Sequence, residues 1–177
     1  MSYKTDSERA HNILYCLTPP RILINSAAYV NGKQFSDRFK KEGFSVLSVG
    51  KFDSRIANEQ MLIKIKKFWE SPSQNPVVVE GYFPMAEDIS NVFTGVYSYV
   101  YLYPNTLKSY AGEIIAMIHS SENHDSEIRR LRELEKTGDP LFKSDFEKFV
   151  RGVADKNREI YKEHCDMFDD KILTVLI

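Results

Sequence analysis

Gly32 and Lys33 stand where a short apolar segment gives way to a helical one, a placement typical of loops that bind phosphate. Backbone N–H groups at the start of a helix attract an anion, and a lysine adds a positive charge. The full pattern is G-x-x-x-x-G-K-[ST], whereas residues 27–34 read AAYVNGKQ. Ala27 thus replaces the leading glycine and Gln34 replaces the hydroxyl residue. The residues expected to contact a phosphate are Asn31, Gly32, Lys33 and Gln34. An ordinary strand-to-helix turn with a solvated lysine is the alternative.

Polar and aromatic residues also follow the next two predicted strands. Arg55 comes after the second strand, and Glu80 is the first polar residue after the valine run of the third. In a phosphoryl transfer, Lys33 would neutralise donor phosphates, Glu80 would hold Mg²⁺ or orient the acceptor hydroxyl, and Arg55 would hold the acceptor. Tyr82 and Phe83 could stack on an acceptor base. Each of these residues also has a structural alternative, as a helix start, a strand end or a packing residue.

A charged segment, EIRRLRELEK, lies before the last helix and supplies further cations. Arg129 and Arg130 could close over a transferring phosphoryl group. Because acidic residues alternate with these arginines, pairing along the helix surface is the simpler explanation. No spacing of histidines or cysteines indicates a metal site, so any Mg²⁺ would arrive with a nucleotide.

The elements that must position these residues alternate between strand and helix. Strands are predicted at 21–25, 44–49, 77–79, 97–103 and 171–177, from short β-branched or aromatic runs. Helices are predicted at 33–41, 53–70, 85–93, 105–120, 126–140 and 143–168. This alternation predicts an α/β protein with a parallel sheet covered on both faces, a three-layer sandwich. Ligands of such sheets bind beyond the carboxyl ends of the strands.

Composition narrows the class of protein. Apolar residues make up 42% of the 177 residues and charged residues 28%, as in ordinary globular chains. There are 24 Lys and Arg against 25 Asp and Glu, so the formal net charge of −1 gives no overall attraction to nucleic acid or to an anionic membrane. No apolar run approaches the ~18 residues of a membrane span. We expect a cytoplasmic protein with no membrane partner, and the oligomeric state stays open.

Taken together, the elements from 21 to 177 resemble the P-loop kinases of nucleosides and nucleoside monophosphates, of the adenylate-kinase type. Gly50 and Arg55 are similar to the glycine and arginine that hold the acceptor phosphate in that family. The stretch EGYFP, from Glu80, resembles the family's Asp-Gly-Phe-Pro-Arg, with Glu for Asp and no arginine following. The helix NTLKSYAGEIIAM lacks an arginine that the family often carries.

The resemblance implies a five-stranded sheet of order 2-3-1-4-5 and a single kinase-like domain over 21–177, with a small helical lid around 121–140. Residues 1–20 would be an N-terminal extension, with a short helix at 7–17. It further implies ATP with Mg²⁺ as phosphoryl donor and a nucleoside or nucleotide as acceptor. Two other functions remain open: a catalytically inactive nucleotide-binding or regulatory protein, and a kinase that acts on a modified base in nucleic acid. The near-neutral charge disfavours the last of these.

Overall fold

A five-stranded, wholly parallel sheet forms the centre of the computed structural model, which describes residues 21–71, 75–120 and 125–177. The strands are β1 (Arg21–Ser26), β2 (Ser45–Lys51), β3 (Val77–Tyr82), β4 (Ser98–Tyr103) and β5 (Ile172–Leu176). Their order is β2-β3-β1-β4-β5, with β1 in the middle. The α/β class and the predicted strand order are confirmed. The predicted extension at 1–20, with its helix, lies outside the described residues.

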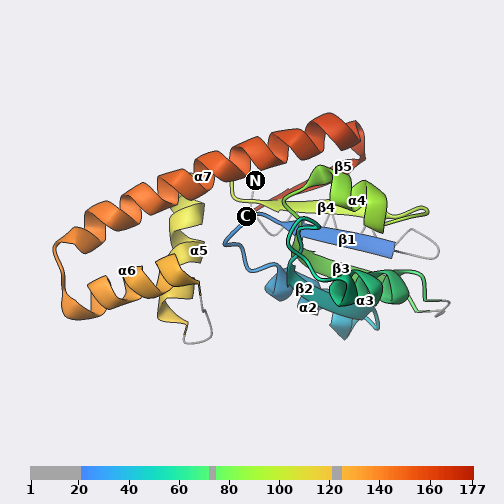
Figure 1. Cartoon of the computed structure of the whole chain (residues 1–177), viewed down its shortest axis with the longest axis horizontal. Helices are drawn as coiled ribbons and strands as arrows, with labels where there is room; N and C mark the ends of the chain where they lie inside the picture. Colours follow the sequence, from blue (N-terminus) through green and yellow to red (C-terminus); the bar gives the residue numbers. More distant parts are fainter. Residues whose placement is uncertain (1–20, 72–74, 121–124) are drawn as a thin grey trace.

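Helices flank this sheet on both faces (Figure 1). They are α2 (Gly32–Lys41), α3 (Glu59–Trp69), α4 (Ala86–Val92), α5 (Leu107–His119), α6 (Ser126–Thr137) and α7 (Leu141–Phe168), and a short 3₁₀ turn, Asp169–Lys171, leads into β5. Successive residues of β1 face opposite sides of the sheet. Ile22 and Ile24 pack with Phe39 of α2, whereas Leu23 belongs to the core that contains Trp69 of α3. The sheet is therefore the middle layer of three.

The alternating tyrosines of β4 pack against the C-terminal half of α7. Tyr103 stacks on Tyr161 with ring centroids 4.4 Å apart, and Tyr101 meets the same ring edge-on at 5.1 Å. Tyr99 contacts Phe168 at 5.1 Å. These aromatic contacts fix the long helix over β4 and so determine where the first half of α7 extends.

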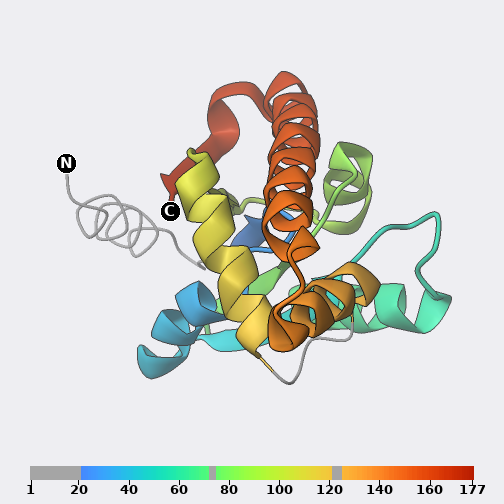
Figure 2. The same cartoon turned by 90° about the vertical axis from the view of Figure 1, so that its left-hand side faces the viewer.

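Beyond the sheet, α5, α6 and the first half of α7 pack into a separate three-helix cluster (Figures 1 and 2). Its apolar centre includes Ile114, Ile118, Leu131 and Val150, all nearly inaccessible to solvent. The segment predicted as a lid, around 121–140, contributes α6 to this cluster, and residues 121–124 lie outside the described part. Gly138, with φ of 64°, ends α6, slightly before the predicted end at residue 140.

Several predicted boundaries differ from those of the structure, and three of the differences have a clear local reason. The helix predicted from residue 53 begins at Glu59, because the Asn58 side chain caps it by accepting the Met61 N–H at 2.9 Å. The helix predicted from residue 105 begins at Leu107, because the Thr106 hydroxyl caps it by accepting the Ser109 N–H at 3.0 Å. Strand β3 continues to Tyr82 through pairing with β2, which places Glu80 inside the strand instead of after it.

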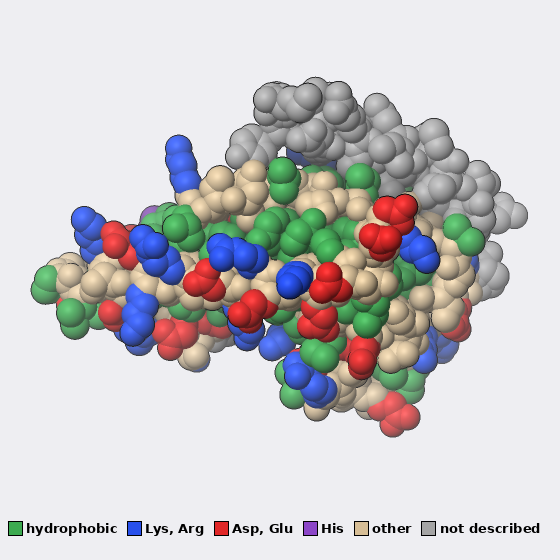
Figure 3. Space-filling view, turned by 90° about the horizontal axis from the view of Figure 1, so that it is seen from above, with side chains coloured by type: hydrophobic (Ala, Val, Ile, Leu, Met, Phe, Trp, Pro, Cys, Tyr) green, Lys and Arg blue, Asp and Glu red, His purple; other side chains and the backbone are tan. Residues whose placement is uncertain are grey.

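Among the described helices, none combines the length and apolar character needed to cross a membrane. The longest, α7, has 28 residues and carries many charges. Seen from above, acidic and basic side chains are interspersed along the molecule on this face instead of gathering into a patch of one sign (Figure 3).

Candidate functional site

Residues 27–31, here called the β1–α2 loop, connect the central strand to α2 and are held by α7. The amide of Asn157 accepts the Ala28 N–H at 3.1 Å and donates to the Ala28 carbonyl at 3.0 Å. Asn157 is fully buried, so neither of its polar atoms is satisfied by bulk solvent. The next residue, Tyr29, has φ of 62°, a conformation that costs a non-glycine residue energy. The Asn157 amide thus stabilises a strained loop.

The other two helices of the cluster also hold this loop. The Tyr29 hydroxyl donates to Asp125 at 3.0 Å, and Asp125 is the residue that caps α6. The Asn31 N–H donates to the Glu113 carboxylate of α5 at 3.1 Å. Glu113 of α5, Asp125 at the start of α6 and Asn157 of α7 therefore all hold the loop.

The remaining backbone N–H groups of the loop are mostly used within the protein. Ala27 donates to the carbonyl of Leu102 at 3.0 Å, Val30 to that of Ala27 at 3.1 Å, and Gly32 to that of Val30 at 3.0 Å. In a phosphate-binding loop these groups would converge on the ligand. The conformation of the loop therefore differs from such a cradle. A protein carboxylate, from Glu113, takes the place of an anion at Asn31.

Four of the predicted phosphate-binding residues line one pocket of about 480 Å³ together with the predicted catalytic Glu80. Its lining comes from the β1–α2 loop (Val30, Asn31), from the start of α2 (Gly32, Lys33, Gln34), from β2 (Ser48, Gly50), from β3 (Glu80), and from α5 and the residue after it (Glu113, Ala116, Met117, Ser120). The strands contributing to it are neighbours in the sheet, so their carboxyl ends meet here. Asn31 also caps α2, through its side chain and the Gln34 N–H at 3.3 Å.

Glu80 lies beneath the first turn of α2 and is only 7% exposed. Burial raises the pKa of this carboxyl, while the Ser48 hydroxyl and the charge of Lys33 act in the opposite direction. The start of α2 can lie this close to Glu80 because Gly32 has no side chain. A Cβ on Gly32 would overlap the Ser26 hydroxyl and come within 2.5 Å of Glu80 Oε1.

Replacing Gly32 by alanine should lower the free energy of unfolding by about 2 kcal/mol, because the added methyl group must displace Ser26 and Glu80. Gly112→Ala on α5 is the matched control, since a Cβ there meets nothing within 4 Å and alanine favours a helix by about 1 kcal/mol. Urea unfolding of both variants measures the difference. Equal stabilities of the two variants would contradict the close packing of Gly32.

Arg55, which was predicted to hold an acceptor, pairs with a carboxylate of its own turn. Its guanidinium donates to both carboxylate oxygens of Asp53, at 2.9 and 2.7 Å. This pairing holds the pKa of the Asp53 carboxyl at about 2. Asp53 is buried, whereas the Arg55 side chain is 65% exposed and does not line the pocket with Lys33. In this conformation Arg55 stabilises the turn between β2 and α3.

The two aromatic residues predicted to stack on a base have different environments. Tyr82 is half-buried. Phe83 is fully buried, and its ring packs against Phe52 and Phe93 in the core. Its backbone N–H and carbonyl are both bonded to the side chain of Asn25, at 2.8 and 3.1 Å. Phe83 therefore presents no ring face to a ligand here, because it fills the core where the strand ends.

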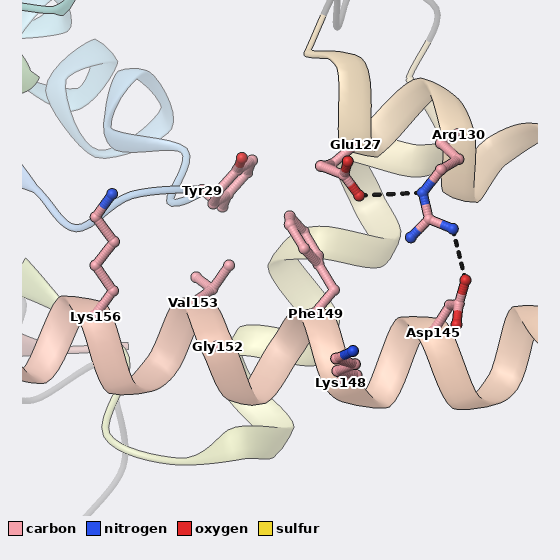
Figure 4. Close-up of a pocket in the computed structure, with 9 residues that line it drawn as sticks. All are labelled: Tyr29, Glu127, Arg130, Asp145, Lys148, Phe149, Gly152, Val153 and Lys156. Carbon is pink, nitrogen blue, oxygen red and sulfur yellow. Dashed lines mark hydrogen bonds and ion pairs between the residues drawn. The ribbon is translucent and has the colours of Figure 1, made fainter.

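The arginines of α6 mostly pair within the three-helix cluster. Arg130 donates to Glu127 at 3.2 Å and to Asp145 at 2.6 Å (Figure 4). Arg132 donates to three carbonyls at the end of α5 and so caps that helix. Arg129 is exposed, and neither Arg129 nor Arg130 lines the pocket with Lys33. The surface-pairing explanation fits Arg130.

Sequence reasoning missed Glu113, Asp125 and Asn157. A helix cap at Asp125 could have been expected from its position just before a charged helical segment. Glu113 and Asn157 bond residues 82 and 129 positions away, so no local pattern could have indicated them. Within the described chain, no cluster of three or more His, Cys, Asp or Glu side chains could bind a metal ion by itself.

No family model, curated protein or solved structure matches this chain.

Proposed function

We propose that the protein is a phosphotransferase that binds ATP in the pocket at the start of α2 and transfers a phosphoryl group to a nucleoside or nucleotide. The observation that carries the proposal is that Lys33 and the buried Glu80 line one pocket at the carboxyl ends of neighbouring strands. Lys33 and the first turn of α2 would attract the phosphates by charge and dipole. Catalysis of phosphoryl transfer consists mainly of such positioning and charge neutralisation.

The Glu80 carboxylate of the pocket suits a divalent cation. It offers the oxygen atoms that Mg²⁺ prefers, and Mg²⁺ arriving with ATP would offset the negative charge of the phosphates. Glu80, inside β3 and held beneath Gly32, would also be fixed in position to orient an acceptor hydroxyl. Arg55 would have to leave Asp53 in order to hold an acceptor phosphate.

A second function is favoured by the β1–α2 loop itself. Its N–H groups are bonded inside the protein, and the Glu113 carboxylate accepts the Asn31 N–H. Both features weaken the attraction for phosphate, so we expect ATP affinity in the range of tens of micromolar or weaker. A nucleotide-binding or regulatory protein without catalysis is consistent with such a loop.

The deciding experiment combines thermal unfolding with ATP and Mg²⁺ and an assay of γ-phosphoryl transfer to a panel of nucleosides and monophosphates. ATP should raise the melting temperature by mass action. Lys33→Met should remove this rise and reduce transfer by at least about 100-fold, since the lysine acts on the transferring group. Lys41→Met, at the exposed end of the same helix, is the control and should change neither result.

Glu113→Gln should strengthen ATP binding about tenfold, because it removes the negative charge that competes for the Asn31 N–H. Stabilisation by ATP without transfer to any acceptor would establish the non-catalytic function. No thermal shift with ATP, in either the unmodified protein or Glu113→Gln, would rule out both functions.

A further inference from the structure

A second pocket, of about 550 Å³, lies between the β1–α2 loop, α6 and α7 (Figure 4). Its aromatic surface comes from Tyr29 and Phe149, whose ring centroids are 5.2 Å apart in an edge-on contact. The strained backbone of Tyr29 and the hydrogen bond from its hydroxyl to Asp125 fix this ring against the mouth of the pocket. Aromatic surfaces held in this way stack well on planar rings.

Gly152 leaves part of the α7 surface bare within this pocket. It lies in the middle of a 28-residue helix, where glycine is less stable than alanine. A Cβ at this position would meet nothing within 4 Å, so no neighbouring protein atom requires the glycine. The absence of a side chain leaves room at the pocket for a flat ligand to approach the helix.

Lys148 and Lys156 stand four residues before and after Gly152, on the same face of α7 and one turn to either side. Within the described parts of the chain, neither ammonium group has an ion-pair partner. Arg130, at the far end of the pocket, is by contrast occupied by Glu127 and Asp145 (Figure 4). The two lysines on either side of Gly152 therefore supply the positive charge available to a ligand.

We propose that this pocket binds a small molecule with a planar aromatic ring and a phosphate group, of the nucleoside monophosphate class. The ring would lie against Tyr29 and Phe149, and the phosphate would lie over Gly152 between Lys148 and Lys156. The site is distinct from the pocket of Lys33 and Glu80. Because Tyr29 belongs to the β1–α2 loop, a ligand here also contacts the segment that shapes the other pocket.

Calorimetric titration with AMP and UMP tests this site, with adenosine and ribose 5-phosphate as the ring-only and phosphate-only probes. Both monophosphates should bind at least tenfold more tightly than either partial probe. Gly152→Leu should abolish binding while leaving the melting temperature unchanged or higher, because leucine favours a helix and fills open space. The double variant Lys148→Gln/Lys156→Gln should weaken binding of the monophosphates at least tenfold.

The matched control is Lys143→Gln/Lys162→Gln, which removes two exposed lysines from the same helix outside the pocket. This double variant should keep full affinity for the monophosphates, and so should Lys33→Met. Loss of ATP binding at the pocket of Lys33 can therefore be distinguished from loss of monophosphate binding at this one. Absence of monophosphate binding at millimolar concentration would overturn the proposal. So would binding that survives Gly152→Leu, or an equal loss in the control pair, which would indicate a general charge effect.

Discussion

Lowering the pH from 7 to 4 should reduce the free energy of unfolding by about 3 kcal/mol through His164 alone. This histidine belongs to α7 and is fully buried against β4, and burial lowers its pKa from 6.5 to about 4. Between pH 6.5 and pH 4, the imidazole of His164 binds a proton in the unfolded chain but stays neutral in the folded chain. The stabilisation is therefore complete above pH 6.5 and is lost as the pH falls toward 4.

Hydrogen bonding explains why the ring must stay neutral. Nε2 lies 3.3 Å from the Pro84 carbonyl, which can only accept, so Nε2 carries the proton. Nδ1 then accepts from the Tyr99 hydroxyl at 2.6 Å, and that hydroxyl accepts from Asn25 Nδ2 at 2.8 Å. A second proton on the ring would remove the acceptor for Tyr99 and bury a charge without a partner.

Urea unfolding at several pH values measures this effect. His164→Gln should be less stable at pH 7 but should lose the fall in stability between pH 6.5 and 4, because the raised pKa of the Glu80 carboxyl acts in the opposite direction. His119→Gln is the control, because His119 is an exposed histidine paired with Glu135. This variant should show the same dependence of stability on pH as the unmodified protein. The carboxyl of Asp53 titrates with a pKa of about 2, below this range. An unchanged pH dependence in His164→Gln would show that another group is responsible.

Asn157→Leu should lower the free energy of unfolding by about 3 kcal/mol, because it leaves both the N–H and the carbonyl of Ala28 without their partner. Leucine has the same number and branching of side-chain heavy atoms as asparagine, so the change leaves no cavity. Hydrogen exchange at the Ala28 amide should accelerate in the folded protein, since the loop would open locally.

Arg158→Leu provides the comparison for this variant, since Arg158 is the next residue of α7 and its side chain is 70% exposed. That change should alter the stability by less than about 0.5 kcal/mol. Suppose instead that Asn157→Leu lowers the free energy of unfolding by less than about 1 kcal/mol and that the Ala28 amide stays protected from hydrogen exchange. Solvent or another side chain would then be the partner of the Ala28 N–H and carbonyl.

The sheet could be predicted because its strands are short apolar runs with clear helical segments between them. The resemblance to nucleotide kinases supplied the strand order, and the pairing of β1 with β3 places Lys33 and Glu80 in one pocket. The partners of the β1–α2 loop could not be predicted, because Glu113 and Asn157 are ordinary helix residues in sequence. Phe83 is bonded to Asn25, 58 positions away, which only the fold brings close. Arg55, by contrast, pairs with Asp53 only two residues earlier, in a turn that lies within a predicted helix.

The three polar anchors of the β1–α2 loop also bear on how the chain folds during synthesis. The loop is made early, but its partners follow 82, 96 and 129 residues later. Strands β1 and β3 can pair once about half of the chain has emerged, whereas the strained conformation at Tyr29 must await α7. Contacts of such wide sequence separation form slowly. We therefore expect the segment that faces the proposed ligands to be among the last to acquire its structure, so that a chain truncated before α7 would keep much of its sheet but lack the pocket that α7 helps to line.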